Sequence, residues 1–162
     1  MLAFIGWTVG AFCVMEVAAY VLHRFVFHGL LWKVHQTHHR PDHHHGPFEW
    51  NDLFSLGFAA VSIGLMWAGH EAPLESVAFP IGVGIALYGL AYFVLHDLYA
   101  HKRFWPIKLE NEAARTVKHA HQRHHQSVSK RGQEPYGLFL FPYDRYTPFR
   151  RSRTPDARRE GL

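Results

Sequence analysis

Three long apolar runs constrain the fold of this chain more than any other feature of its sequence. A helix needs about 20 apolar residues to cross a bilayer core of roughly 30 Å, because it rises about 1.5 Å per residue. The runs 2–22 and 77–95 reach that length, and 53–69 is at its lower limit. We therefore expect an all-α, polytopic membrane protein with three to four membrane helices, folded as one domain over 1–162 with a mobile tail from about 150 to 162.

The basic residues are unevenly distributed around these runs. Lys and Arg are absent from 1–22 and 41–95, and fourteen of the seventeen lie after His101. Basic loops of membrane proteins stay in the cytoplasm. The loop HEAPLESV between the last two runs has two acids and no Lys or Arg, so we expect it on the opposite side. We therefore expect residues 23–52 and 96–162 to form a cytoplasmic, histidine-rich helical cap on a bacterial inner membrane. This placement of charge also argues against nucleic-acid binding, which a pI near 9.4 would otherwise suggest.

Ten of the fifteen histidines form one two-part pattern that occurs twice. In each copy an H-x4-H pair follows an apolar run directly, and an H-x2-H-H triplet comes later. The residues are His23, His28, His35, His38 and His39 in the first copy, and His96, His101, His121, His124 and His125 in the second.

Helix geometry gives these spacings a meaning. Positions i, i+3 and i+4 lie within roughly 100° on one helix face, so each triplet presents its imidazoles together. Positions i and i+5 are about 140° apart on an ideal helix. The two histidines of each pair can therefore meet at one site only if the helix ends, bends or widens between them. Gly29 follows the first pair, which is consistent with a helix end.

The number and type of these ligands indicate a metal site with two ions. Imidazole nitrogen suits Fe, Zn, Cu or Ni, and ten histidines exceed the four to six ligands of one ion. A single histidine at a membrane boundary is more often an interfacial or hydrogen-bonded residue than a ligand. Ten at repeated chelating spacings on one side of the membrane have no such explanation, because each would be a polar group that needs a partner.

The other five histidines are weaker candidates. His70 is expected at the opposite membrane face. His119 lies about 200° around the helix from His121 and should face elsewhere. The run 43–45 follows Pro41, and we interpret it as a solvated loop, with a second metal site or a supporting role as alternatives.

Several acids could accept the second ring proton of a metal-bound histidine. The candidates are Glu16, Asp97 and Glu49. For Glu16, a structural hydrogen bond between helices is an equally good interpretation. Asp52 is better explained as the N-cap of the second apolar helix.

The region after the last apolar run is expected to be partly helical. Residues 107–125 have acids at the first helical turn. The residues of the predicted inward face recur at helical spacing and are Ala113, Val117, Ala120, His121 and His124. The aromatic stretch 136–149 is too short to span a membrane, and we interpret it as interfacial.

Five stretches of the sequence together carry a resemblance to a known family: MEVAAYVLHRFVFHG, HQTHHRP, GPFEWNDLF, ALYGLAYFVLHDLYAHKRF and HAHQRHH. They resemble the bacterial-type β-carotene hydroxylases of the fatty acid hydroxylase and sterol desaturase superfamily. The resemblance implies a non-heme di-iron centre held by the ten motif histidines, with O2 as oxidant and ferredoxin or a similar electron donor. It implies hydroxylation of C3 of carotenoid β-ionone rings, from β-carotene through cryptoxanthin to zeaxanthin. Zn could replace Fe in purified protein.

The chemistry agrees with this resemblance. An unactivated ring C–H needs an oxidant that protein side chains cannot provide but a metal centre that reduces O2 can. A carotenoid is apolar, so we expect it to enter from the membrane lipid, with Phe139 and Phe141 shaping the entrance.

Two other functions remain open from the sequence. The first is hydroxylation or desaturation of another lipid, such as a fatty acid, sterol or alkyl chain, by the same histidine cluster. The second is a membrane metal transporter, which should place metal ligands inside the spans or on both faces. The apolar run 2–22 has one acid and no histidine, which makes transport the weaker alternative.

Overall fold

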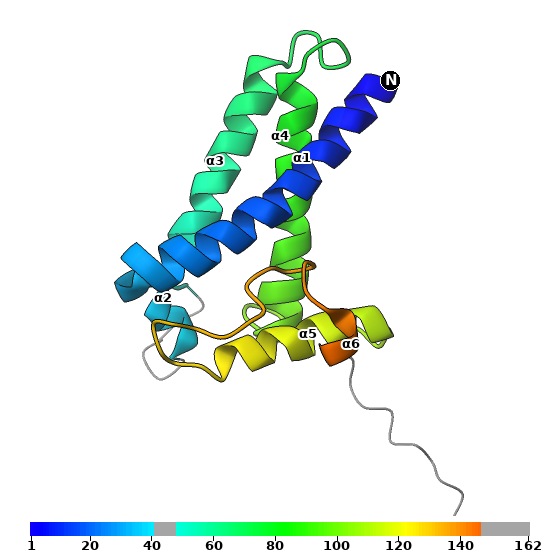
Figure 1. The fold of residues 1–162 in the computed structure, drawn as a ribbon. Helices are drawn as coiled ribbons and strands as arrows, with labels where there is room; N and C mark the ends of the chain where they lie inside the picture. Colours follow the sequence, from blue (N-terminus) through cyan, green and yellow to red (C-terminus); the bar gives the residue numbers. More distant parts are fainter. Residues whose placement is uncertain (41–47, 147–162) are drawn as a thin grey trace, which may run out of the picture.

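The computed structural model describes residues 1–40 and 48–146, and their secondary structure is entirely helical (Figure 1). The all-α prediction is confirmed. The elements are α1 (Leu2–Val21), η1 (Leu22–Leu30), α2 (Trp32–His39), α3 (Asp52–Ala68), α4 (Ala78–Tyr92), η3 (Phe93–Ala100), α5 (Glu112–His125) and α6 (Tyr143–Tyr146).

Two helices are long and apolar enough to cross a membrane. They are Leu2–Leu30, with 29 residues, and Ala78–Ala100, with 23 residues. Both therefore extend several residues beyond the apolar runs from which they were predicted. The third apolar helix, α3, has 17 residues and is shorter.

The apolar helices form a bundle with α4 in the centre, packed against both α1 and α3 (Figure 1). Glycines allow these helices to approach closely. A Cβ atom on Gly84 would lie 2.7 Å from the Cβ of Ala11 on α1, and one on Gly82 would lie 2.7 Å from the carbonyl oxygen of Ser62 on α3. The Ser62 hydroxyl donates to the Gly82 carbonyl at 2.8 Å, which adds a polar link between α3 and α4.

The outward side chains of the bundle are apolar and exposed. Leu2 is 87 % exposed, Trp67 is 72 % exposed and Leu90 is 59 % exposed. Only 17 % of the apolar window of the first long helix and 22 % of that of the second are buried. The core helices of a soluble protein would be mostly buried, so this exposure favours a lipid environment.

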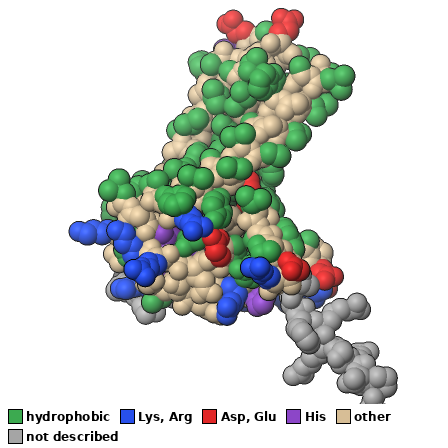
Figure 2. Space-filling view, in the orientation of Figure 1, with side chains coloured by type: hydrophobic (Ala, Val, Ile, Leu, Met, Phe, Trp, Pro, Cys, Tyr) green, Lys and Arg blue, Asp and Glu red, His purple; other side chains and the backbone are tan. Residues whose placement is uncertain are grey.

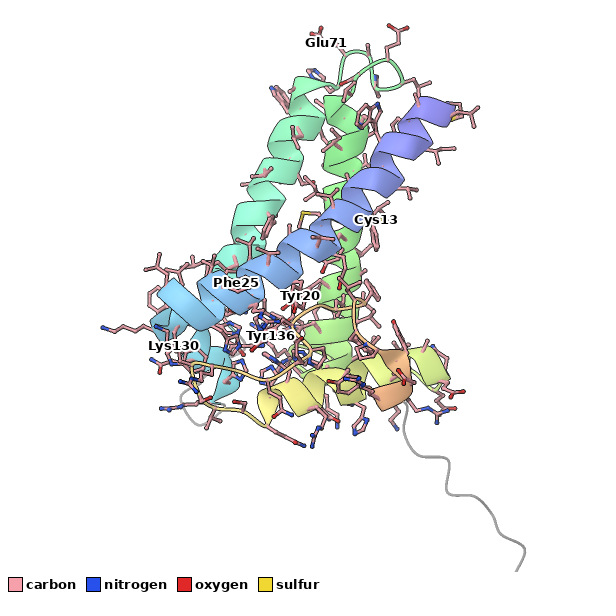
Figure 3. All side chains as sticks on the ribbon, in the orientation of Figure 1. Cys13, Tyr20, Phe25, Glu71, Lys130 and Tyr136 are labelled. Carbon is pink, nitrogen blue, oxygen red and sulfur yellow. The ribbon has the colours of Figure 1, made fainter. Side chains whose placement is uncertain are left out.

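Charged side chains gather at the two ends of the molecule (Figure 2). Acidic side chains lie at the end formed by the α3–α4 loop, where Glu71 is found (Figure 3). The Lys and Arg side chains visible in Figure 2 lie at the other end, together with further acidic side chains. Between them the visible surface is largely apolar. The pattern is that of a membrane-spanning bundle with one basic end.

The helix α5 lies across this basic end and packs against η3 (Figure 1). It begins at Glu112 and not at 107, because Asn111 caps it: the Asn111 side chain accepts a hydrogen bond from the Ala114 amide at 2.7 Å. Its buried face carries Ala114, not the predicted Ala113, together with Val117, Ala120 and His124.

The segment after α5 runs back along the inner side of the basic end. Tyr136 and Leu138 are buried at 8 % and 6 % exposure, so this part of the stretch predicted to be interfacial is packed inside the protein. The tail expected at 150–162 lies outside the described residues.

Candidate metal centre

The ten motif histidines converge beneath the bundle in two groups of five. Within each group, the possible ligand nitrogens all lie within 4.8 Å of one another. The first histidine group contains His23, His28, His35, His39 and His124. The second histidine group contains His38, His96, His101, His121 and His125.

Each H-x2-H-H triplet is divided between the groups. His35 and His39, one turn apart on α2, enter the first group, while His38 enters the second. On α5 the arrangement is reversed, because His121 and His125 enter the second group and His124 the first. Each half of the chain therefore contributes one histidine to the group built mainly by the other half, which ties the two halves together.

Each H-x4-H pair meets in its group because the helix widens there. η1 and η3 are π-helical, with hydrogen bonds between residues five positions apart. The His101 amide donates to the His96 carbonyl at 2.9 Å, and the rings of His96 and His101 are 4.6 Å apart. The rings of His23 and His28 are 5.1 Å apart. The helical path breaks directly afterwards at Gly29, where φ is −111° and ψ is −105°.

In the first group every ring is oriented by an oxygen at Nδ1. Four of these oxygens are backbone carbonyls, and the fifth is the side-chain oxygen of Asn51, 2.8 Å from the Nδ1 of His35. The carbonyls and their histidines are Tyr136 with His23, Lys130 with His28, Ser127 with His39 and Gln133 with His124.

These contacts determine where the ring protons lie. A neutral imidazole has one N–H, and a carbonyl oxygen can only accept, so the proton is on Nδ1 and the lone pair on Nε2. The Nε2 atoms face one another, at 3.0 Å between His23 and His35 and at 3.2 Å between His28 and His124. Lone pairs at these distances repel, and a cation between them removes the repulsion. The donor set therefore fits a bound metal ion.

In the second group carboxylates take the place of carbonyls at two rings. The Nδ1 of His38 donates to Glu49 at 2.7 Å, and the Nδ1 of His96 donates to Asp97 at 3.0 Å. Both acids were predicted to have this position. The Nε2 atoms of His38 and His96 are 3.1 Å apart, and the buried Nε2 of His125 has no hydrogen-bond partner among the described residues. This group fits a metal ion as well.

Burial favours the neutral form of the histidines that lie outside the two long apolar helices. It lowers the pKa of His35 to about 3, that of His39 to about 2 and that of His124 to about 4. Burial, followed by repulsion from neighbouring imidazolium charges, also lowers the pKa of the second-group residues His38, His101, His121 and His125. Neutral imidazole is the form that binds metals, so the groups are ready to bind ions at neutral pH.

Two further histidines, His119 and His70, lie apart from both groups. His119 is exposed on α5, with its Nδ1 2.8 Å from the Tyr146 carbonyl. His70 is exposed near the α3–α4 loop, with its Nδ1 2.6 Å from the Trp67 carbonyl. The run 43–45 lies outside the described residues.

Two of the predicted acids have other roles in the structure. Glu16 accepts hydrogen bonds from the Tyr88 hydroxyl at 2.8 Å and from the amides of Phe139 and Leu140 at 2.9 and 2.7 Å. It therefore joins α1 to α4 and to the C-terminal segment, as its structural interpretation proposed. Asp52 does not cap α3 with its side chain; Asn51 occupies the N-cap position, and Asp52 pairs with Arg103 at 2.7 Å.

An apolar cavity of about 400 Å³ lies between the apolar helices and extends to the histidines. Histidines from both groups, including His23 and His96, lie in its wall. The wall also includes Phe27, Phe54, Phe58, Met66, Tyr136 and Leu138. Phe27 and Phe54 stack at 3.8 Å between ring centroids.

A second, more polar hollow of about 470 Å³ adjoins the second group and is lined by Glu49, Arg103, Gln122 and Gln126 among others.

The two expected entrance residues lie outside this cavity wall. Phe139 stacks on Phe12 at 6.2 Å, and Phe141 stacks on Tyr143 at 4.4 Å. The same segment instead reaches the cavity through 136–138. The sequence does not reveal which side chains of this irregular segment point inward, because it has no regular periodicity.

Sequence reasoning also missed Arg103, Asn51 and Tyr136. A signal for Arg103 was present, because three acids near the histidines require a buried counter-charge and Arg103 follows His101 closely. The backbone carbonyls that orient the first group carry no sequence signal at all.

Comparison with known proteins agrees with this site. The fatty acid hydroxylase family model matches residues 8–147. A beta-carotene hydroxylase of Pantoea ananas is 37% identical over 132 residues, which cover 79% of this chain and 71% of the relative. One from Pseudescherichia vulneris is 38% identical over 135 residues, covering 81% and 71%.

Plant relatives are similar over the same region. The chloroplastic beta-carotene 3-hydroxylase 1 of Arabidopsis thaliana is 41% identical over 139 residues, 83% of this chain and 43% of the relative. The chain thus spans less than half of the length of this plant relative. No solved structure gives a significant match. With a family model that covers most of its length and bacterial relatives matched over more than two thirds of theirs, this chain belongs to the fatty acid hydroxylase family.

Proposed function

We propose that this protein is a non-heme di-iron monooxygenase that hydroxylates the β-ionone rings of carotenoids at C3. The observation that carries the proposal is the pair of five-histidine groups at the inner end of an apolar cavity. The relatives that match most of this chain are named beta-carotene hydroxylases, which supports the choice of substrate.

The all-histidine donor set suits iron, and Zn can occupy the same positions. Two iron ions would supply the reduction of O2 to an oxidant strong enough for an unactivated C–H bond. One oxygen atom enters the ring as a hydroxyl group and the other leaves as water. Two protons and two electrons complete the balance, and ferredoxin or a similar donor provides the electrons.

The protein would position the carotenoid ring and exclude water from the reaction. The cavity wall is formed by apolar and aromatic side chains, such as Phe27, Phe54 and Phe58, and by histidines of both groups. One ring of the carotenoid would occupy the cavity while the polyene remains among the apolar helices. An apolar wall orients the ring through shape and excludes bulk water from the reacting carbon.

The arrangement also supports a location in the membrane. The apolar bundle would span an inner membrane, with the histidine groups at its cytoplasmic edge where the basic residues gather (Figure 2). The polar hollow beside the second group would face the cytoplasm, where a soluble electron donor has access.

The test is expression in a host that accumulates β-carotene, followed by pigment chromatography and iron quantitation of the purified protein. We expect cryptoxanthin and zeaxanthin to appear and about two iron atoms per chain to co-purify. An unchanged carotenoid profile with hydroxylated or desaturated fatty acids would instead support another lipid substrate. Protein that carries no metal under iron-replete conditions would refute the metal centre itself.

A further inference from the structure

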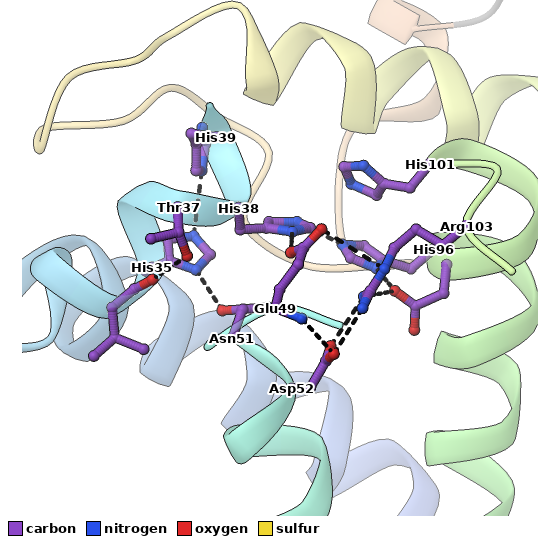
Figure 4. Close-up of polar contacts among 12 residues, drawn as sticks. His35, Thr37, His38, His39, Glu49, Asn51, Asp52, His96, His101 and Arg103 are labelled. Atoms are coloured by element: carbon purple, nitrogen blue, oxygen red, sulfur yellow. Dashed lines mark hydrogen bonds and ion pairs between the residues drawn. The ribbon is translucent and has the colours of Figure 1, made fainter. Parts of the chain in front are cut away.

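The guanidinium group of Arg103 is buried and lies close to three carboxylates (Figure 4). Its side chain is only 9% exposed, and it lies three residues after the end of η3 and two after His101. It donates to both oxygens of Asp52, at 2.9 and 2.7 Å, and to Asp97 at 2.9 Å. Its Nε lies 3.6 Å from a Glu49 oxygen.

Two of these carboxylates also hold histidines. Glu49 uses one oxygen toward Arg103 and the other, Oε2, for the Nδ1 of His38. Asp97 uses Oδ1 for both Arg103 and the Nδ1 of His96. One guanidinium therefore reaches two histidines of the second group, each through a single carboxylate.

The first group has a different kind of support. Its five Nδ1 atoms face neutral oxygens, four on the backbone and one on Asn51. Around Arg103, by contrast, three carboxylates surround one cation, so this network carries a formal excess of negative charge beside the second group. Carboxylate-supported imidazole is a stronger donor to a metal than carbonyl-supported imidazole.

We propose that Arg103 is a positioning residue for the second histidine group and that its carboxylate network makes the two metal positions unequal. The inference rests on the proposed di-metal function and adds to it. Arg103 fixes the carboxylates of Glu49 and Asp97, and these fix the proton on Nδ1 of His38 and His96, which leaves both Nε2 lone pairs directed at the ion. The second position then holds its metal more strongly and in a more electron-rich environment than the first.

A purely structural role for Arg103 is the main competing explanation. Its bidentate pair with Asp52 attaches the segment after η3 to the first turn of α3, and losing that link could loosen the fold. A second competitor is a simple charge effect, in which the buried positive charge repels a metal cation and its removal strengthens metal binding. The three explanations predict different results for matched variants.

The experiment compares the full-length protein with Arg103→Gln and Arg103→Lys, purified in detergent and loaded with ⁵⁷Fe. Iron per chain and the Mössbauer spectrum are measured in the resting protein, without substrate. We expect the parent protein to hold about two iron atoms in two distinguishable environments of equal abundance.

Removal of Arg103 should affect one environment selectively. In Arg103→Gln we expect iron to fall to about one per chain, with roughly 10- to 100-fold weaker binding at the lost position. The surviving Mössbauer signal should match one of the parent signals. Arg103→Lys should show the same selective loss in weaker form, because an ammonium group keeps the charge but cannot hold the carboxylates in the same planar geometry.

Two controls separate the competing explanations. Asp52→Asn weakens the attachment to α3. Its amide oxygen can still accept the hydrogen bond that the Glu49 amide donates to Asp52 Oδ2 at 2.9 Å, so Glu49 and Asp97 should keep their contacts with His38 and His96, and both iron atoms should be retained. Asn51→Ala removes the side-chain support of His35 and should disturb the other Mössbauer signal. If Asp52→Asn loses the same iron as Arg103→Gln, the role of Arg103 is structural.

Other outcomes also decide the question. Retention of both irons with unchanged spectra in Arg103→Gln would overturn the positioning role, as would tighter binding in that variant or parent-like behaviour of Arg103→Lys. Two indistinguishable iron environments in the parent protein would overturn the inequality of the positions. If the parent protein binds no iron at all, the proposed function itself fails, and this result is distinct from a failure confined to Arg103.

Discussion

His28 and His124 are 96 positions apart in the sequence, yet their Nε2 atoms lie 3.2 Å apart. The segment that follows α5 orients both rings, because the carbonyls of Lys130 and Gln133 accept their Nδ1 protons. This contact closes the first histidine group between the two halves of the chain. Its two facing lone pairs are the clearest local indication that a cation belongs between the rings.

The first prediction uses two histidines of the same helix. His124→Ala should lose bound metal from the first group and reduce ring hydroxylation at least 100-fold, because the two-ion chemistry requires both groups. The matched control is His119→Ala on α5, whose exposed ring lies outside both groups. Iron analysis and pigment chromatography of membranes with equal protein levels provide the measurement. Equal activity in both variants would contradict the assignment of His124.

The second prediction concerns the volume of the apolar cavity. Ala59→Phe should fill part of the wall next to Phe58 and lower carotenoid turnover about 10-fold or more, with iron content unchanged. Its neighbour Ala60 is similarly exposed on α3 but lies outside the cavity wall, so Ala60→Phe is the control. Similar turnover in the two variants would show that the substrate ring binds elsewhere.

The third prediction concerns the contact between α1 and α4. Gly84→Val should destabilise the protein by about 1–3 kcal/mol, because its side chain would collide with the Thr8 carbonyl and with Ala11. Gly64→Val is the control, since a Cβ there meets nothing within 4 Å. Thermal unfolding in detergent measures the effect. A melting temperature for the Gly84 variant equal to that of the control would refute the close helix contact.

The fourth prediction concerns acid stability. The folded protein lowers the pKa of His35, His39 and His124 to about 3, 2 and 4, below the ordinary value near 6.5. As the pH falls from 6.5 toward 4, the unfolded chain therefore takes up protons that the folded chain does not accept. The free energy of unfolding of metal-free protein should fall through this range and be nearly constant above pH 7.5.

Melting curves between pH 8 and pH 4.5, with and without a chelator, check the sign of this effect. Bound metal competes with protons for the same nitrogens, so loaded protein should keep its melting temperature to a lower pH. A melting temperature that rises on acidification of the metal-free protein would contradict the burial of neutral imidazoles.

The helical class, the apolar helices and the ten histidines that gather at one end of the bundle could be predicted from the sequence. These follow from local periodicity: apolar runs of sufficient length form helices in lipid, and the i, i+3 and i+4 spacing places imidazoles on one face. The same periodicity correctly separated His119 from His121. It also indicated that His23 and His28 can meet only if the helix ends, bends or widens between them. The helix widens there, in η1.

The division of the histidines into two groups and the contacts that support each ring depend on how the helices pack in three dimensions. The exchange of His38 and His124 between the halves depends on the relative orientation of α2 and α5, which no local pattern encodes. Backbone carbonyls that orient the first group are the same in every residue type, so the sequence cannot mark them. The network around Arg103 joins residues from α3, η3 and the segments beside them, and buried charges are compensated in space, wherever they lie in the chain.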